Sequence, residues 1–186
     1  MTINIRWGKP LPVWCFDMEA RPGPWGGGDF TYRDKLSMAG GYEGKTIRYL
    51  APGFTAEQLE RFITPLRKPC LVVAHNGRRY DLPFLNGLVM KLGLRPLPPV
   101  LLSDTYADMP KKGRAFSGSL GNLAQRFGIS AKGHMSEPEW ERVYAGDKAA
   151  LRHLREYNIG DVQATLELRR ALIERGLLNP ARIWRP

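Results

Sequence analysis

The sequence contains few cysteines and no long apolar run, and each absence excludes a class of protein. Cys15 and Cys70 are the only cysteines in 186 residues, too few for a disulfide framework. Both lie in apolar runs typical of strands, so we expect reduced core residues in a cytoplasmic protein. No apolar run approaches the roughly 18 residues of a membrane-spanning helix. The beginning of the chain, MTINIRW, also lacks the charged start and long apolar core of a signal peptide.

Acidic residues are in short supply relative to basic ones. The chain has 18 Asp and Glu against 28 Lys and Arg, which gives a formal net charge of +10. Within the stretch 61–98, Asp81 is the single acidic residue among seven basic ones. A strongly positive surface favours polyanions, and nucleic acid is the commonest such partner. Charge alone leaves a merely soluble basic protein as the alternative.

The order of apolar runs and chain breakers predicts a mixed α/β architecture. A chain of 186 residues, 43% of them apolar, is long enough for one domain with a sizeable core. Strands are expected at 13–20, 35–41, 45–50, 70–74 and 100–103, and helices from about Thr55, Asp81, Ser119, Ser136 and Asp147. Strands that come first, followed by strands alternating with helices, indicate a mixed β-sheet flanked by α-helices. We therefore expect a single domain over residues 1–186.

The strand predicted at 13–20 ends with two carboxylates one residue apart. Successive side chains of a strand point to opposite faces, so Asp17 and Glu19 share a face, about 7 Å apart along the backbone. Two anions near an apolar core are costly unless something positive lies between them. A divalent cation is the simplest candidate. The alternative is that both residues lie beyond the end of the strand, in solvent.

Two further acidic residues occur where a strand has ended or a helix faces inward. Asp81 follows the apolar strand 70–74 and begins a helix, where a simple N-cap is the alternative interpretation. In the last helix Tyr157 and Asp161 are four residues apart and therefore share a face. Asp161 lies at the boundary of the apolar stripe, although a solvent-facing carboxylate beside a core tyrosine would give the same pattern.

Together these positions resemble the three exonuclease motifs of the DEDD superfamily, the 3′–5′ exonucleases on a ribonuclease-H-like fold. The motifs are Asp17-x-Glu19, Asn76-x-x-x-Tyr80-Asp81 and Tyr157-x-x-x-Asp161, in that order. Tyr157, four residues before Asp161, matches the tyrosine branch of that superfamily, whereas the histidine branch would require His where Glu156 stands. The run 74–85 is most similar to the exonuclease domain of family-B DNA polymerases and its free-standing relatives. The resemblance covers about residues 13–172.

The resemblance implies a two-metal phosphodiester hydrolysis that shortens single-stranded DNA from its 3′ end and releases nucleoside 5′-monophosphates. It implies that Asp17 bridges both ions, that Glu19 and Asp161 hold the ion that activates water, and that Asp81 acts on the second ion. Tyr157 would orient the attacking water, since a phenol with an ordinary pKa near 10 is a poor base at neutral pH. Carboxylate oxygens suit Mg²⁺ or Mn²⁺.

Other residues are weaker candidates for the same site. Met18, Asn76 and Phe84 are candidate substrate contacts, with core packing as the alternative for Phe84. Asp104, at the end of the strand 100–103, either joins the metal shell or caps the following turn, and we favour the cap. The Gly- and Pro-rich loop 21–29 is longer than the usual turn of the family, so no substrate contact is transferred to it. His134 and His153 are predicted to be surface residues without a nameable partner.

Three alternative functions remain open from the sequence. A 3′–5′ exoribonuclease would share the tyrosine motif, an endonuclease would share the fold, and a non-catalytic module would bind nucleic acid without cleaving it. The expected partner is the 3′ end of single-stranded DNA or RNA, with no membrane, and replication or repair proteins are further candidates. The chain contains no polymerase domain, so a proofreading role does not follow.

Overall fold

The computed structural model describes residues 10–20, 36–42, 45–110, 118–130 and 135–186. The elements in chain order are β1 (Val13–Ala20), β2 (Leu36–Tyr42), β3 (Thr46–Leu50), α1 (Ala56–Ile63), the 3₁₀ helix η2 (Thr64–Arg67), β4 (Leu71–Ala74), α2 (Asp81–Lys91), β5 (Val100–Asp104), α3 (Leu120–Arg126), α4 (Glu137–Tyr144), α5 (Lys148–Glu174) and β6 (Arg182–Trp184). The Gly- and Pro-rich loop 21–29 and His134 lie outside the described residues.

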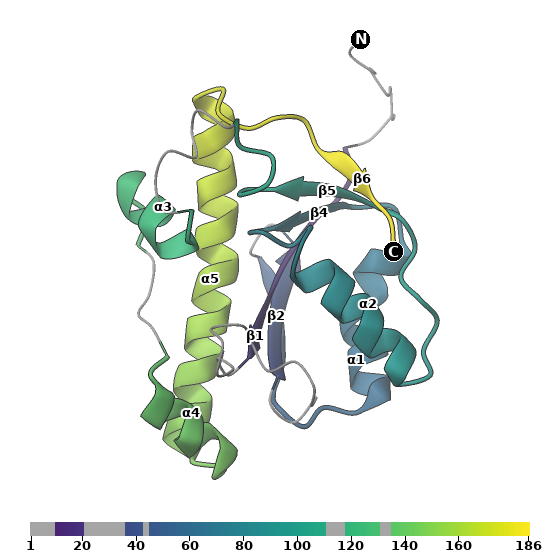
Figure 1. Ribbon diagram of the computed structural model, residues 1–186, viewed down its shortest axis with the longest axis vertical. Helices are drawn as coiled ribbons and strands as arrows, with labels where there is room; N and C mark the ends of the chain where they lie inside the picture. Colours follow the sequence, from purple (N-terminus) through teal and green to yellow (C-terminus); the bar gives the residue numbers. More distant parts are fainter. Residues whose placement is uncertain (1–9, 21–35, 43–44, 111–117, 131–134) are drawn as a thin grey trace.

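One six-stranded mixed sheet, in the order β3-β2-β1-β4-β5-β6, organises the fold (Figure 1). The strands β1, β2 and β3 form an antiparallel meander, and β4 and β5 extend it in parallel with β1. This arrangement confirms the predicted mixed α/β sheet, and the antiparallel pair β2 and β3 corresponds to the strands expected at 35–41 and 45–50. The antiparallel edge strand β6 was not predicted, because a strand of three residues is too short to show the alternation of apolar and polar residues.

The alternation of side chains along β1 separates two apolar cores. Trp14, Phe16 and Met18 belong to the larger core, which packs the sheet against α1 and α2. Cys15 belongs to the smaller core, which packs the other face against Val162 of α5. Figure 1 shows α5 on one side of the sheet and α1 with α2 on the other. Since side chains alternate along a strand, Asp17 and Glu19 share the α5 side with Cys15.

The helix α5 is the longest element, with 27 residues and a length of about 40 Å. It begins at the predicted N-cap Asp147, whose carboxylate accepts a hydrogen bond of 2.8 Å from the backbone N–H of Ala150. The helices α3 and α4 pack along its outer side (Figure 1). His153 has a partner that the sequence did not suggest, because its Nδ1 lies 2.8 Å from Glu139 Oε1 on α4. Among the described helices, none combines the length and apolarity needed to cross a bilayer.

The predicted helix starts are reproduced because their signals are local. At the predicted start of α1, Thr55 and Gln58 form a capping box, and Ser136 with Glu139 forms another at the predicted start of α4. Asp81 does begin α2, but Tyr80 occupies the N-cap position and no side chain caps the helix. The interpretation of Asp81 as an N-cap is therefore wrong, and its buried carboxyl group requires another explanation.

Close packing between β1 and β2 depends on a glycine. A Cβ atom added at Gly40 would lie 2.6 Å from Cζ2 of the buried Trp14, whereas one added at the exposed Gly87 of α2 would meet nothing within 4 Å. We expect Gly40→Ala to lower the free energy of unfolding by about 1–3 kcal/mol through overpacking. The matched control Gly87→Ala should raise it by about 0.5–1 kcal/mol. Urea unfolding measures both, and equal effects would contradict this packing.

Candidate active site

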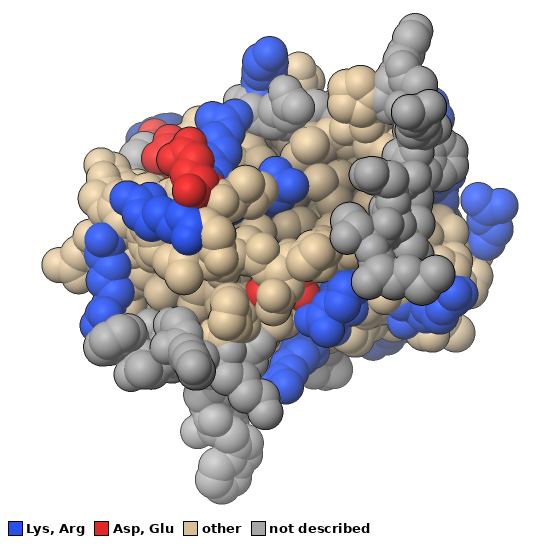
Figure 2. Space-filling view, turned by 90° about the horizontal axis from the view of Figure 1, so that it is seen from above, with Lys and Arg blue, Asp and Glu red and all other residues tan. Residues whose placement is uncertain are grey.

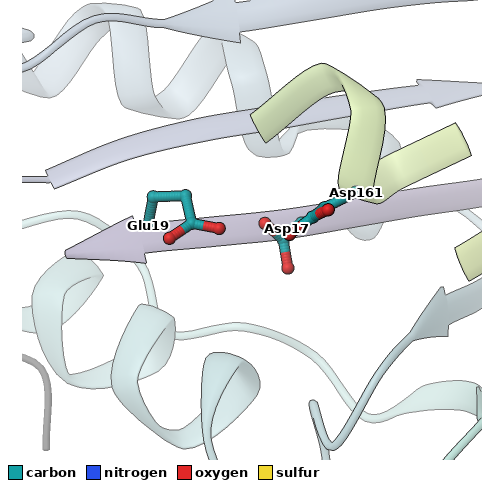
Figure 3. A group of neighbouring side chains, drawn as sticks. All are labelled: Asp17, Glu19 and Asp161. Atoms are coloured by element: carbon teal, nitrogen blue, oxygen red, sulfur yellow. The ribbon is translucent and has the colours of Figure 1, made fainter. Parts of the chain in front are cut away.

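Three carboxylates meet where α5 crosses the end of β1. One oxygen each from Asp17, Glu19 and Asp161 lies within 4.8 Å of the other two. Figure 3 shows the first two side chains following the strand and the third coming from the helix. The strand places Asp17 and Glu19 on one face by its period of two, and the helix places Asp161 opposite them. The interpretation of Asp17 and Glu19 as solvent residues beyond the strand is therefore wrong, since β1 continues to Ala20.

The electrostatics of this cluster are unfavourable without a cation. Burial raises the pKa of Asp17 well above its usual range, and the neighbouring carboxylates Glu19, Asp81 and Asp161 raise it further. Burial, followed by the charge of Asp161, raises the pKa of Glu19 to about 8. Burial raises the pKa of Asp161 to about 6. An all-oxygen donor set whose members repel one another fits a hard divalent ion such as Mg²⁺ or Mn²⁺.

Asp81 lies beside this cluster rather than within it. Its side chain is 8% exposed and is not one of the three mutually close carboxylates. Burial raises the pKa of Asp81 to about 7, and its charge in turn raises the pKa values of Asp17 and Glu19. Gly77 permits the turn that leads to it, because a Cβ added there would lie 2.4 Å from the Cβ of Ala74. Asp81, at the start of α2, lines the same cleft as Asp17, so the fourth predicted carboxylate borders the cluster.

Tyr157 lies one helical turn before Asp161 on α5. Its ring is half-buried, and it packs against a further apolar cluster, which lies between α4 and α5. Burial raises the pKa of Tyr157 above its usual value, and the charges of Glu19, Asp161 and Asp17 raise it further. The phenol therefore keeps its proton at neutral pH and can donate a hydrogen bond.

Asn158 is a site residue that the sequence interpretation missed. It is fully buried, and its Nδ2 donates a hydrogen bond of 2.7 Å to Asp17 Oδ2. Its Oδ1 accepts a hydrogen bond of 3.4 Å from the hydroxyl of Ser37 on β2. The available signal was an amide on the inner face of α5, three residues before Asp161. A buried amide of this kind needs partners on both of its polar atoms.

Asp104 has the role of a turn cap. The carboxylate is fully buried and accepts four backbone N–H bonds of 2.8–3.0 Å, from Asn76, Arg78, Tyr106 and Ala107. These bonds hold the loop that connects β4 to Asp81, including the positive φ of 61° at Asn76. Its oxygens are thus engaged, and it is not in the group of carboxylates that could hold an ion.

A second missed network ties the last strand to this loop. Oδ2 of the fully buried Asp108 accepts a bond of 2.9 Å from the backbone N–H of Asp104. Its Oδ1 accepts two bonds from Arg182 of β6, from Nη2 at 2.6 Å and from Nε at 3.1 Å. The short strand β6 therefore supports Asp104, which in turn supports the loop before Asp81.

An open cleft of about 660 Å³ adjoins the carboxylates. Its lining includes Asp17, Met18, His75, Asn76, Arg79, Tyr80, Asp81, Tyr106, Gly118 and Ser119. Two of the predicted substrate contacts, Met18 and Asn76, thus line the cleft. The third, Phe84, lines a separate groove of about 430 Å³ with Arg79, Tyr80 and Pro83, and it also packs against the larger core. Figure 2 shows a face on which basic side chains are spread widely and acidic ones form small groups.

Comparisons with known proteins agree with this architecture. A family model described as the RNase_H superfamily matches residues 14–173. A solved structure of the family B DNA polymerase from the hyperthermophilic archaeon Pyrobaculum calidifontis is similar, with a TM-score of 0.63 and 22% sequence identity. The match covers 89% of this chain and 25% of the polymerase chain, so this chain spans about a quarter of that protein. A search among curated proteins gives no match. The predicted ribonuclease-H-like fold is thereby confirmed.

The raised pKa values predict how stability depends on pH when a chelator is present. The carboxyl group of Glu19, with a pKa of about 8, holds a proton that the unfolded chain releases near pH 4. Its contribution to stability is therefore complete below about pH 4 and is lost as the pH rises through 8. We expect Glu19→Gln to be more stable than wild type at pH 8 in EDTA, with the difference shrinking toward pH 5.

Thermal unfolding followed by circular dichroism at several pH values measures this difference. Glu167→Gln is the control, because Glu167 is an exposed carboxylate on the same helix as Asp161. It should show no such pH-dependent gain. A gain from Glu19→Gln that is equal at pH 5 and pH 8 would show that ionisation of Glu19 does not strain the site.

Proposed function

Because the chain belongs to the RNase_H superfamily, we propose that it is a metal-dependent 3′–5′ exonuclease that shortens single-stranded DNA and releases nucleoside 5′-monophosphates. One observation carries the proposal: three carboxylates from β1 and α5 lie within 4.8 Å of one another beside an open cleft. Structural sites rarely gather carboxylates in this way, because each raises the cost of ionising the others. Functional sites do so to hold metal ions.

The carboxylates fit two divalent ions, Mg²⁺ or Mn²⁺. Asp17, Glu19 and Asp161 would hold one ion, and Asp17 with Asp81 would hold the second. When bound, such a pair ionises water at neutral pH and neutralises charge on the entering and leaving oxygens. The separation of Asp81 from the other three supports its assignment to the second ion, as the resemblance to the tyrosine branch implies.

Tyr157 would position the water that attacks the phosphodiester. Its raised pKa supports a neutral phenol, which donates a hydrogen bond and leaves proton removal to other groups. Its place one turn before Asp161 directs it toward the ligands Glu19 and Asp161, whose charges both act on it.

The cleft and the charge of the chain support a nucleic-acid substrate. Its volume of about 660 Å³ falls in the range of about 300–1,000 Å³ typical of ligand sites. Met18 and Asn76 would contact the terminal nucleotide, and the exposed Arg79 would contact a phosphate. A net charge of +10 would attract a polyanionic strand to an acidic centre that ions have neutralised. Binding of DNA in preference to RNA rests on the resemblance.

Digestion of matched 5′-labelled single-stranded DNA and RNA, with Mg²⁺, Mn²⁺ or EDTA, tests the proposal. We expect a metal-dependent ladder that shortens from the 3′ end of DNA. Asp17→Ala should lower the rate on the order of 100-fold or more, because it removes a ligand of both ions. Glu167→Ala, which removes an exposed carboxylate of α5, should cleave as wild type does.

The other outcomes of that digestion identify the alternatives. A ladder on RNA alone would assign an exoribonuclease, and cleavage of circular single-stranded DNA would assign an endonuclease. No cleavage of either strand, together with binding that survives EDTA, would reject catalysis in favour of a binding module.

Tyr157→Phe separates the positioning of water from the binding of metal. We expect a loss of activity of about 100-fold or more, since misplacing the reacting group is costly even when the ligands are intact. Binding of Mn²⁺, measured by electron paramagnetic resonance of the free ion, should remain as in wild type. If Mn²⁺ binding weakened as much as in Asp161→Ala, Tyr157 would be a support for the ligands instead.

A further inference from the structure

One buried side chain outside the predicted motifs touches a carboxylate of the site. Asn158 is fully buried on the inner face of α5, and its Nδ2 lies 2.7 Å from Asp17 Oδ2. The opposite end of its amide faces β2, where the buried hydroxyl of Ser37 donates to Oδ1 over 3.4 Å. Asn158 therefore links Ser37 of β2 to the Asp17 carboxylate of β1.

The two hydrogen bonds of Asn158 are unequal. A length of 2.7 Å is at the short end of the range for a hydrogen bond from an N–H donor to an oxygen. The bond from Ser37, at 3.4 Å, is at the long end of the range and is the weaker of the two. The dominant interaction of the amide is thus with Asp17 rather than with the neighbouring strand.

The charge of the site also fixes which way the amide faces. With a divalent ion bound, the Asp17 carboxylate would be ionised and would act only as a hydrogen-bond acceptor, so the NH₂ group of Asn158 would face it. The hydroxyl of Ser37 donates to the remaining oxygen and makes this orientation consistent at both ends. With Oδ2 engaged in this way, the rotation of the carboxylate about its last bond is restricted. The restricted carboxylate is the one that belongs to the cluster with Glu19 and Asp161.

We propose that Asn158 is a positioning residue, which holds the carboxylate of Asp17 in the orientation that a bound divalent ion requires. The inference rests on the proposed function, because it takes Asp17 to be a metal ligand. Groups that hydrogen-bond to metal ligands orient them, and their removal lowers metal affinity by about 10–100-fold. A merely structural amide, which only ties α5 to the sheet, would affect stability and leave metal affinity unchanged.

The experiment measures Mn²⁺ binding to the wild-type chain and to Asn158→Leu by electron paramagnetic resonance of the free ion. Leucine is similar in size and removes the donor. We expect the dissociation constant for Mn²⁺ to rise about 10–100-fold in this variant. The Mn²⁺ concentration that gives half-maximal cleavage should rise in parallel.

Two further variants control the comparison. Thr165→Val removes another buried polar group of α5, one whose hydroxyl has no hydrogen-bond partner among the described residues, and it should bind Mn²⁺ as wild type does. Ser37→Ala keeps Asn158 but removes its anchor, and it should weaken Mn²⁺ binding several-fold. If Asn158→Leu does not fold, Mn²⁺ binding by Ser37→Ala tests the inference in its place.

The outcomes distinguish this inference from the proposed function. Unchanged Mn²⁺ binding in Asn158→Leu, or in Ser37→Ala where the first variant is unfolded, overturns the inference while leaving the metal centre in place. A wild-type chain that binds no Mn²⁺ overturns the proposed function instead. An equal loss of binding in Thr165→Val would assign the effect to general loosening of α5 and would also overturn the inference.

Discussion

The alternation of side chains along β1 is the constraint on which the rest of the structure depends. Trp14, Phe16 and Met18 anchor one face of the strand in the larger core, so their neighbours must face α5. Asp17 and Glu19 cannot turn away toward water without removing those three residues from the core. Burial of apolar side chains thus provides the free energy that holds repelling carboxylates together. The helix α5 completes the site by supplying Asp161 from the facing surface.

The two sides of the site are supported by different physical means. The side formed by β1 and α5 is held by apolar packing and by one buried amide, Asn158. The side that carries Asp81 follows an irregular loop, which has no regular ladder to satisfy its backbone. There the carboxylate of Asp104 accepts the backbone N–H groups, and Asp108 with Arg182 supports Asp104 in turn. The fully buried Asp104 thus accepts the backbone hydrogen bonds that a regular helix or strand would otherwise satisfy.

The sequence predicted what depends on near neighbours in the chain. Capping boxes, the period of the strands and the three motif spacings each span fewer than ten residues, and the sheet and the helix starts followed from them. The predictions failed where partners are distant. Arg182 and Asp108 are 74 residues apart, and Asn158 and Asp17 are 141 apart, so no local pattern marks either pair. For Asp81 the sequence left the N-cap open as an alternative, because a cap and a site carboxylate look alike in sequence at a helix start, and the structure removes that alternative.

The distribution of charge reconciles a basic chain with an acidic site. At physiological ionic strength, salt screens electrostatic attraction over a distance of about 8 Å. A net charge of +10 would therefore attract a polyanion mainly within that distance of the protein surface. The carboxylate cluster acts at much shorter range, and its burial makes the repulsion of phosphate strong there unless cations are bound. Under the proposed function, attraction of the substrate and its cleavage would therefore depend on different charged groups of the chain. The basic surface would attract a polyanionic strand with or without bound ions, whereas entry into the cleft beside Asp17 would require the carboxylates to be neutralised. Bound cations would then be needed for substrate entry as well as for chemistry.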